Sequence, residues 1–205
     1  MALITVPSFL KTHMESAELR LERTDFQMRS AFTMQRQVLA WHSGHMWVCT
    51  ASVPNLEEPK AGQMRSFLAG MRGRVNTAQF PVPGYRGPSN GYSGPAGLIN
   101  GAGQSGYSIN TDGWTPGVQV LPDGSYFTIN GELKIVRGNV TSTGSGAATI
   151  SFEPSLRYAP PDNAQIVIND PYCVMSMSDS NGAGWGMRSP FLQSNQLAFE
   201  EAVNV

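Results

Sequence analysis

The segment between residues 47 and 80 constrains the fold of this chain more than any other part of the sequence. It begins with alternating side chains, the two-residue period of a strand that presents two different faces. One set is Trp47, Cys49 and Ala51, and the other is Val48, Thr50 and Ser52. Pro54 ends this strand, and a second strand is expected at Gln79–Val82. The segment predicts a strand, a helix and a strand, with the helix lying on a sheet.

The helix is expected from about residue 58 to residue 72. Its apolar side chains recur every three or four positions and form one stripe. The stripe consists of Ala61, Met64, Phe67, Leu68 and Met71. Pro59 suits the first turn, where its missing N–H costs nothing, and Gly73 can take the left-handed conformation that ends a helix. The residues expected to have structural roles here are Trp47, Phe67, Leu68, Met71 and Gly73.

Short strands are also expected before this segment, at Leu19–Arg23 and Ser30–Ala40, where apolar side chains are interleaved with Gln and Arg. Ser43-Gly44 is a turn signal between two apolar arms, so it predicts a hairpin over Val38–Val53. Together these elements make residues 1–83 an N-terminal β-sheet or split-barrel domain with one packed helix.

Residues 84–117 are rich in Gly and Pro and cannot form a helix of any length. They are predicted to be a linker or a long functional loop. Its aromatic side chains are the candidate subunit contacts: Tyr85, Tyr92, Tyr107 and Trp114. Glycine loses much entropy on ordering and offers no side chain in return. We therefore expect Gly84–Gly106 to be ordered by a neighbouring subunit.

The C-terminal half shows short strands with explicit turns, which predicts a small β-barrel or sandwich over residues 118–190. Asn130-Gly131 is the strongest hairpin signal in it, because both turn positions need a positive φ. A last strand is expected at Leu197–Val203, so that residues 191–205 can return to the first domain. The predicted fold class is therefore mainly β with one helix.

Charge is sparse, since Asp, Glu, Lys and Arg make up 14% of the residues, against about 25% in typical soluble domains. Charge usually keeps soluble proteins apart, so this composition favours association with neighbours. The net charge of −1 argues against a nucleic-acid binder that works by counterion release. Near the N-terminus, Pro7 and Lys11 leave the apolar stretch too short for a membrane segment, and no secretion signal is expected.

No group of residues predicts catalysis. Gly101–Gly106 matches a dinucleotide fingerprint, but a Gly/Pro tract precedes it and a strand-like segment follows, where a strand and a helix are needed. His42, His45 and Cys49 are possible metal ligands without a fourth ligand nearby, so solvated turn histidines are the favoured interpretation. Cys49 and Cys173 are expected to be buried thiols. We expect no enzyme, no cofactor and no metal site.

The order of these features resembles a family of bacteriophage proteins. The similarity begins in residues 47–84, where a Trp-bearing strand ends in Val-Pro and is followed by a helix, the sequence FLAGMRGR and a Phe-containing strand. It continues through QSG, PDG, FTINGELKIVRGNV, ISFEPSLRYAPPDNA and the closing FEEAV. From Ala40 to the C-terminus, the chain resembles tail proteins of phages with long, non-contractile tails.

This resemblance implies a distal tail protein or a close relative, located at the tail tip of the virion. Such a protein is expected to form a homo-oligomeric ring, a hexamer by this resemblance, that joins the tail tube to the hub and host-recognition apparatus. The implied partners are further copies of the chain, the tail tube protein and the hub or tip proteins. The chain departs from the family at residues 123–129, where DGSYFTI replaces the usual GD-x-IQI. This departure leaves the entry strand of the barrel open. The resemblance alone does not separate a distal tail protein from a tail-tube protein or another tail-tip protein.

A carbohydrate-binding or host-surface-recognition module of the virion is the alternative hypothesis. In such a module, aromatic rings would stack on sugar faces, and the candidates are Tyr107, Trp114, Tyr158 and Trp185. The competing interpretation places these rings in the barrel core and at subunit contacts, where aromatic residues are common. A ring predicts a defined oligomer and a lectin-like module predicts a monomer, so the mass of the purified protein separates them.

Overall fold

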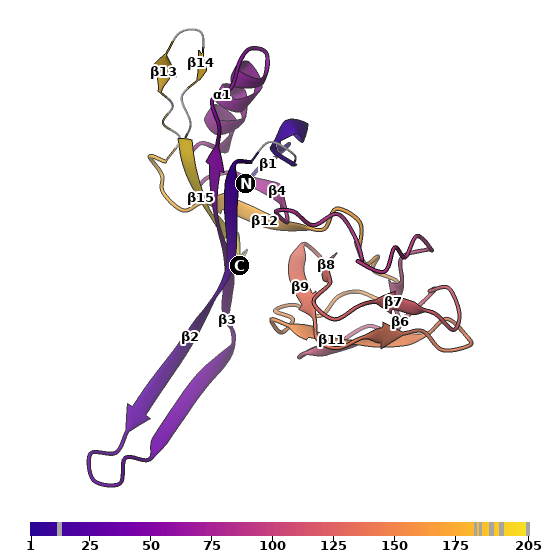
Figure 1. The fold of residues 1–205 in the computed structure, drawn as a ribbon. Coiled ribbons are helices and arrows are strands. Elements are labelled where there is room, and N and C mark those ends of the chain that lie inside the picture. The colour runs from indigo at the N-terminus through magenta and orange to yellow at the C-terminus, as the bar shows by residue number, and fades with distance from the viewer. Residues whose placement is uncertain (12–13, 183, 185, 189–190, 193–194, 204–205) are drawn as a thin grey trace.

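The chain forms two β-rich units and a long two-stranded arm, as shown by a computed structural model (Figure 1). The structure describes residues 1–11, 14–182, 184, 186–188, 191–192 and 195–203. Strands account for 42% of the residues and helices for 9%. The expectation of a mainly β fold with a packed helix is therefore confirmed.

The first unit is built on a six-stranded sheet. Across the sheet, the strands are β1 (Leu3–Ile4), β4 (Thr77–Pro81), β12 (Tyr172–Met177), β15 (Asn195–Glu201), β3 (Arg36–Val53) and β2 (Ser16–Arg29). The β1–β4 pair is parallel and the other neighbours are antiparallel. Strands from both ends of the sequence thus lie side by side, and β15 bridges β12 and β3.

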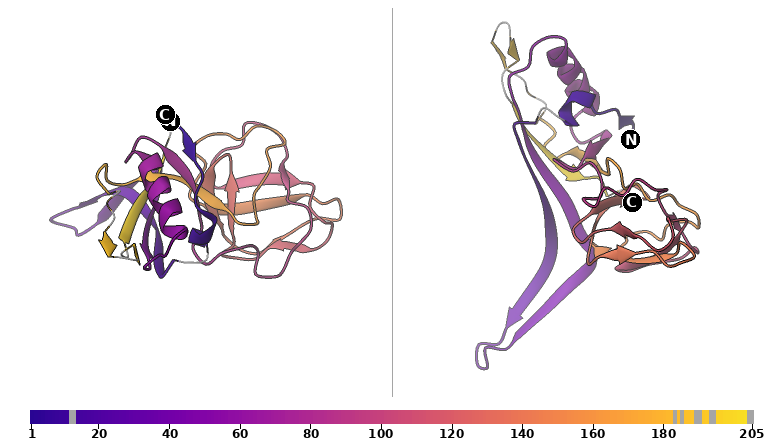
Figure 2. Two further views of the ribbon diagram at one scale, coloured as in Figure 1. Left: turned by 90° about the horizontal axis from the view of Figure 1, so that it is seen from above. Right: turned by 45° about the vertical axis from the view of Figure 1, so that its right-hand side comes forward.

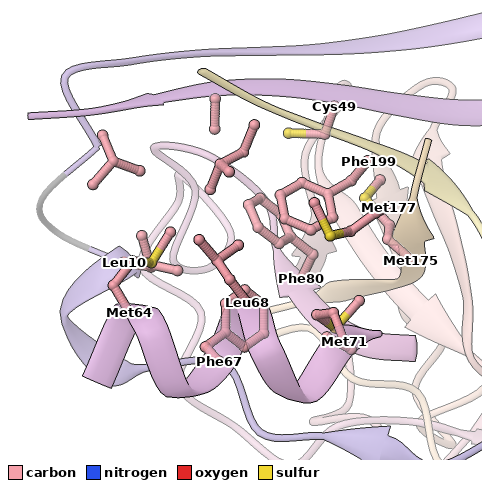
Figure 3. Packing of buried hydrophobic residues seen from close by; sticks show 14 of the residues in the cluster. Leu10, Cys49, Met64, Phe67, Leu68, Met71, Phe80, Met175, Met177 and Phe199 are labelled. Carbon is pink, nitrogen blue, oxygen red and sulfur yellow. The ribbon is translucent and has the colours of Figure 1, made fainter. Parts of the chain in front are cut away.

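Helix α1 (Lys60–Met71) packs on this sheet through the predicted apolar stripe, whose five members are all buried. Figure 3 shows the helix side chains directed toward Phe80 of β4 and Phe199 of β15. The ring centroids of Phe80 and Phe199 lie 4.7 Å apart. The short 3-10 helix η1 (Ser8–Lys11) adds the buried Leu10 to the same core.

The end of α1 differs slightly from the prediction, because two successive residues are left-handed. Arg72 has a φ of 49° and Gly73 a φ of 63°. A Cβ atom at Gly73 would lie 2.6 Å from the carbonyl oxygen of Ser180. Position 73 therefore requires glycine both for its backbone conformation and for the close approach of the chain near Ser180.

The second unit is a half-barrel around a core of its own. Its five-stranded sheet consists of β5 (Leu98–Ile99), β6 (Ser108–Asp112), β11 (Ala148–Glu153), β9 (Glu132–Val136) and β8 (Tyr126–Ile129), in that order. A second pair consists of β7 (Gln119–Leu121) and β10 (Val140–Thr141). Asn130 and Gly131 have φ angles of 49° and 80°, the values expected of the turn between β8 and β9.

The unit boundaries differ from those expected from the sequence. Strands β5 and β6 lie within the stretch predicted as a linker or loop, yet they belong to the second sheet. Strand β12 lies within the predicted barrel range, yet it belongs to the first sheet. The remaining short hairpin is β13 (Met187–Arg188) with β14 (Phe191–Leu192).

The Gly/Pro-rich stretch is ordered by its own chain rather than by a neighbour. The N–H of Ile166 donates to the carbonyl of Gly97, and the N–H of Leu156 donates to the carbonyl of Gly106. The N–H of Asp170 donates to the carbonyl of Arg86 in the same way. The expectation that Gly84–Gly106 depends on a neighbouring subunit is therefore wrong at these positions.

The predicted hairpin at Ser43-Gly44 is also wrong, because that dipeptide lies inside the continuous strand β3. The actual turn spans residues 30–35, and it joins β2 to β3 in one long hairpin. The strand expected at Ser30–Ala40 is therefore wrong over residues 30–35, and β3 begins at Arg36. There the N–H groups of Phe32 and Thr33 donate to Ser30 Oγ, and Met34 has a φ of 57°. The distal half of the hairpin projects far from both units (Figures 1 and 2).

Candidate functional site

Among the described residues, exposed apolar side chains gather on this projecting hairpin. We call residues 25–41 the arm. It begins where the pairing of β2 with β3 shifts register between Arg23 and Asp25. Its exposed large apolar strand residues are Phe26 (58% exposed), Met28 (55%), Val38 (39%), Leu39 (51%) and Trp41 (65%).

Three of these side chains, those of Phe26, Met28 and Leu39, belong to one face of the arm. Residues paired across two strands share a face, and successive residues alternate between faces. Phe26 pairs with Leu39, and Met28 follows Phe26 by two positions. Trp41 lies in the irregular stretch between the pairs Asp25–Ala40 and Arg23–His45. The opposite face carries Asp25, the pair Gln27 with Val38 and the pair Arg29 with Arg36. The arm is therefore an amphipathic ribbon, whose apolar face is covered by nothing in the described part of the chain.

Both edges of the arm are also open. Strand β2 is the last strand of the six-stranded sheet, and among the described residues no strand pairs with its outer edge. On the other side, β15 pairs with β3 only at Val48–Val53, which lies outside the arm. Unpaired N–H and C=O groups along such edges are a template for pairing with another chain.

A second cluster, at the junction of the two units, consists of buried charges. The guanidinium of Arg157 binds both carboxylate oxygens of Glu201, at 2.6 and 3.0 Å, and also donates to the carbonyl of His45. Glu201 Oε2 in addition accepts the backbone N–H of Trp47 at 3.0 Å. Burial lowers the pKa of Arg157, but the hydrogen bonds and charge of Glu201 outweigh that effect and raise it overall.

Lys134 extends this cluster into the second unit. It is fully buried, and its ammonium binds Glu132 Oε2 and the carbonyl of Ser155, each at 2.7 Å. Burial lowers the pKa of Lys134, and Glu132 partly opposes this. Trp47 links the units again, because its indole N–H donates to the carbonyl of Leu133 at 2.9 Å. Each of these charges is paired within the protein, although Arg157 Nε has no hydrogen-bond partner among the described residues. We interpret the cluster as a structural joint between the two units.

His45 in this joint predicts a pH-dependent stability. The expectation of a solvated turn histidine is wrong for His45, because its side chain is buried within strand β3. Both of its ring nitrogens lack hydrogen-bond partners among the described residues. Burial lowers its pKa, and the charges of Arg23, Arg157 and Lys134 act in the same direction, while Glu153 opposes them.

The unfolded chain therefore takes up a proton at His45 at a higher pH than the folded one. Well above pH 6.5 the imidazole is neutral in both states, so its protonation makes no contribution to the free energy of unfolding. Below that pH the unfolded state takes up the proton before the folded state does, so the free energy of unfolding should fall as the pH is lowered from about 6.5. Urea titrations of the wild type and His45→Gln across this range check the prediction. Parallel pH dependences for the two proteins would contradict it.

The candidate subunit contacts pack largely within their own chain. Trp114 is 3% exposed, its indole N–H donates to Thr111 Oγ1 at 2.7 Å, and its ring lies edge-on to Tyr92. Tyr85 is half-buried against Tyr126, with ring centroids 5.3 Å apart. Tyr107 is also half-buried. Trp114 and Tyr85 therefore have core roles, and the arm offers the exposed aromatic surface that sequence reasoning missed.

The aromatic residues proposed for sugar stacking differ in their exposure among the described residues. Trp114 is buried in the second core, whereas Tyr158 is 50% exposed. Trp185 lies outside the described residues. A flat exposed ring is the usual platform for a sugar face, so the burial of Trp114 removes one of the proposed platforms.

The residues considered above as cofactor or metal ligands do not form a binding site within the described part of the chain. Gly101–Gly106 leads into strand β6 rather than into a helix. The described residues contain no group of three or more His, Cys, Asp or Glu side chains that could hold a metal ion. Cys49 and Cys173 are buried thiols. Burial raises the pKa of Cys49 to about 12 and that of Cys173 well above its usual value, so both stay protonated at neutral pH.

Comparisons with known proteins add no relative. The chain matches no protein-family model, and a search of curated proteins finds no significant match. Within the described residues, no helix has both the length and the apolar character needed to cross a bilayer.

Proposed function

We propose that this protein is a ring-forming structural component of a bacteriophage tail tip, similar to a distal tail protein. In this role, several copies form a closed ring, six by the resemblance described above, between the tail tube and the hub with its host-recognition proteins. The proposal places the protein in the virion and gives it no catalytic activity.

The observation that carries this proposal is the uncovered amphipathic arm. An isolated two-stranded ribbon is at best marginally stable in water, so a ribbon of this length needs a surface to pack on. Contiguous exposed apolar patches on soluble proteins generally mark interaction sites. The arm projects away from its own units (Figure 2), so the surface that covers it must belong to another molecule.

A second copy of the chain can satisfy both needs of the arm. This second copy can pair with the open edge of β2 or β3 through backbone hydrogen bonds, and it can cover the apolar face of the arm at the same time. The two edges of one arm are different surfaces, so pairing the β2 edge of one copy with the β3 edge of the next is a heterologous contact. Contacts of this type close into rings when the rotation between copies permits it. The low overall charge favours such association as well.

The carbohydrate-binding alternative predicts a monomer with free aromatic platforms. The burial of Trp114 and the projecting arm both disfavour it. No feature of the described residues favours it specifically over the structural role.

The mass of the purified protein, measured by light scattering and native mass spectrometry, tests the proposal. We expect one defined oligomer for the wild type. Replacing the cross-strand pair Phe26 and Leu39 by Ser should release monomers, because each apolar side chain contributes roughly 1.5 kcal/mol or more when buried. Two such losses per contact weaken association on the order of a hundredfold.

Gln27→Ser is the matched control, since it shortens an exposed side chain of the opposite face. This variant should keep the wild-type mass. A wild-type protein that remains monomeric at high concentration would overturn the ring proposal, and glycan-array binding by that monomer would favour the alternative.

A further inference from the structure

We propose that the tip of the arm, residues 29–36, binds the surface of an anionic lipid bilayer. This goes beyond the ring, because the ring requires the strand faces and edges of the arm, whereas the turn that closes the hairpin lies beyond them. The proposal rests on the apolar apex of the turn, on two adjacent arginines behind it and on the convex shape of the tip.

The apex of the arm is apolar and unusually exposed. Phe32 is 99% exposed and Met34 is 68% exposed. The turn that carries them is held by its own hydrogen bonds, since Met34 N–H donates to the carbonyl of Ser30 at 3.1 Å and Ser30 N–H to the carbonyl of Gln35 at 3.0 Å. A formed turn presents its apolar side chains without the cost of ordering a loose loop on binding.

Two like charges sit directly behind this apex. Arg29 and Arg36 are cross-strand partners, a placement that is unfavourable in an isolated hairpin. Neither forms an ion pair with any carboxylate in the described part of the chain, and the segment 26–41 contains no Asp or Glu. An anionic partner would relieve this repulsion, and arginine pairs well with phosphate groups.

The shape of the tip favours a lipid surface over a folded protein. A hairpin turn buries little area, well below the roughly 800 Å² per partner of a stable protein interface. A protein partner would need a pocket shaped for the turn. A bilayer needs no such complementarity, because apolar side chains enter the headgroup boundary while basic side chains remain among the phosphates.

Several tips acting together would make a weak contact effective. Each arginine near an anionic surface and each inserted apolar side chain contributes modestly. In an oligomer the second and later tips bind at a high effective concentration, so the total affinity rises steeply. The lipid contact of one tip, however, does not depend on the ring.

Vesicle co-sedimentation tests this proposal, with the full chain and vesicles of equal parts phosphatidylcholine and phosphatidylglycerol. We expect binding that falls as salt is added, and much weaker binding to vesicles of phosphatidylcholine alone. Phe32→Ser should weaken binding about tenfold per tip, from the loss of one inserted apolar side chain. Arg29→Gln with Arg36→Gln should weaken it by about fivefold per arginine.

Val75→Ser is the matched control, because Val75 is an exposed apolar residue outside the arm, 57% exposed. It should bind like the wild type. Absence of wild-type binding to phosphatidylglycerol vesicles, or undiminished binding by Phe32→Ser, overturns the proposal. The wild-type protein could also pellet in the absence of vesicles. If Phe32→Ser abolished that pelleting, the proposal would be overturned in favour of the tip binding to a second copy of the chain. The oligomer mass of each sample, measured in parallel, shows separately whether the ring is formed.

Discussion

Replacing Leu68 by Asp is expected to abolish cooperative folding of the first unit. Leu68 is 1% exposed and lies in the middle of the helix stripe that covers the six-stranded sheet. The carboxylate would be placed among apolar neighbours, including Phe80 and Met71, as Figure 3 shows. An unpaired buried charge together with the lost apolar contacts costs more than about 5 kcal/mol, comparable to the whole stability of many domains.

Two variants isolate the effect of the buried charge. Ser66→Asp introduces the same carboxylate on the exposed side of α1 and should change stability by less than about 0.5 kcal/mol. Leu68→Met keeps the volume and should cost less than about 1.5 kcal/mol. Circular dichroism and thermal melting compare the four proteins. A soluble Leu68→Asp protein with a wild-type melting curve would contradict the packing of α1 on the sheet.

The features predicted correctly from the sequence are those encoded by residues close together in the chain. The stripe of α1 needs only the 3.6-residue period of a helix, and all its members are buried. The Asn130-Gly131 turn needs only two adjacent residues that tolerate a positive φ, and both have one. Local chemistry was sufficient in both cases.

The arm shows where local signals mislead. Ser43-Gly44 has the composition of a turn, but the backbone of Gly44 is not in the left-handed conformation. Both residues lie inside strand β3. The actual turn contains Phe32 and Met34, which are poor turn residues by composition. Turn propensity is a weak preference, and the pairing of two long strands overrides it. Alternation could have revealed the arm, because the apolar residues Phe26 and Met28 are two positions apart.

The second unit and the joint depend on contacts between distant residues. Glycines in the stretch 84–117 suggested a loop, but the carbonyl of Gly97 pairs with the N–H of Ile166 and Trp114 fills the core beside it. Arg157 and Glu201 are 44 positions apart, and Trp47 and Glu201 are 154 apart. Nothing in a single sequence indicates which charges meet over such separations, so this joint could not be predicted.

Arg157→Met is expected to lower the free energy of unfolding by about 3–5 kcal/mol, because it leaves the buried Glu201 carboxylate without its counter-charge. In the wild type the exposed fractions of the two side chains are 8% and 4%, so water cannot replace the guanidinium. The variant also removes the hydrogen bond to the carbonyl of His45, which links the second unit to β3.

A double-mutant cycle separates the lost charge pair from the lost packing. Glu201→Gln keeps an acceptor for the N–H of Trp47, so the combination Arg157→Met with Glu201→Gln should be more stable than the sum of the single losses predicts. Urea unfolding of the four proteins gives the interaction energy, which we expect to exceed about 1 kcal/mol because the pair is buried. Additive losses would show that Arg157 and Glu201 contribute independently and that the joint does not act as a unit.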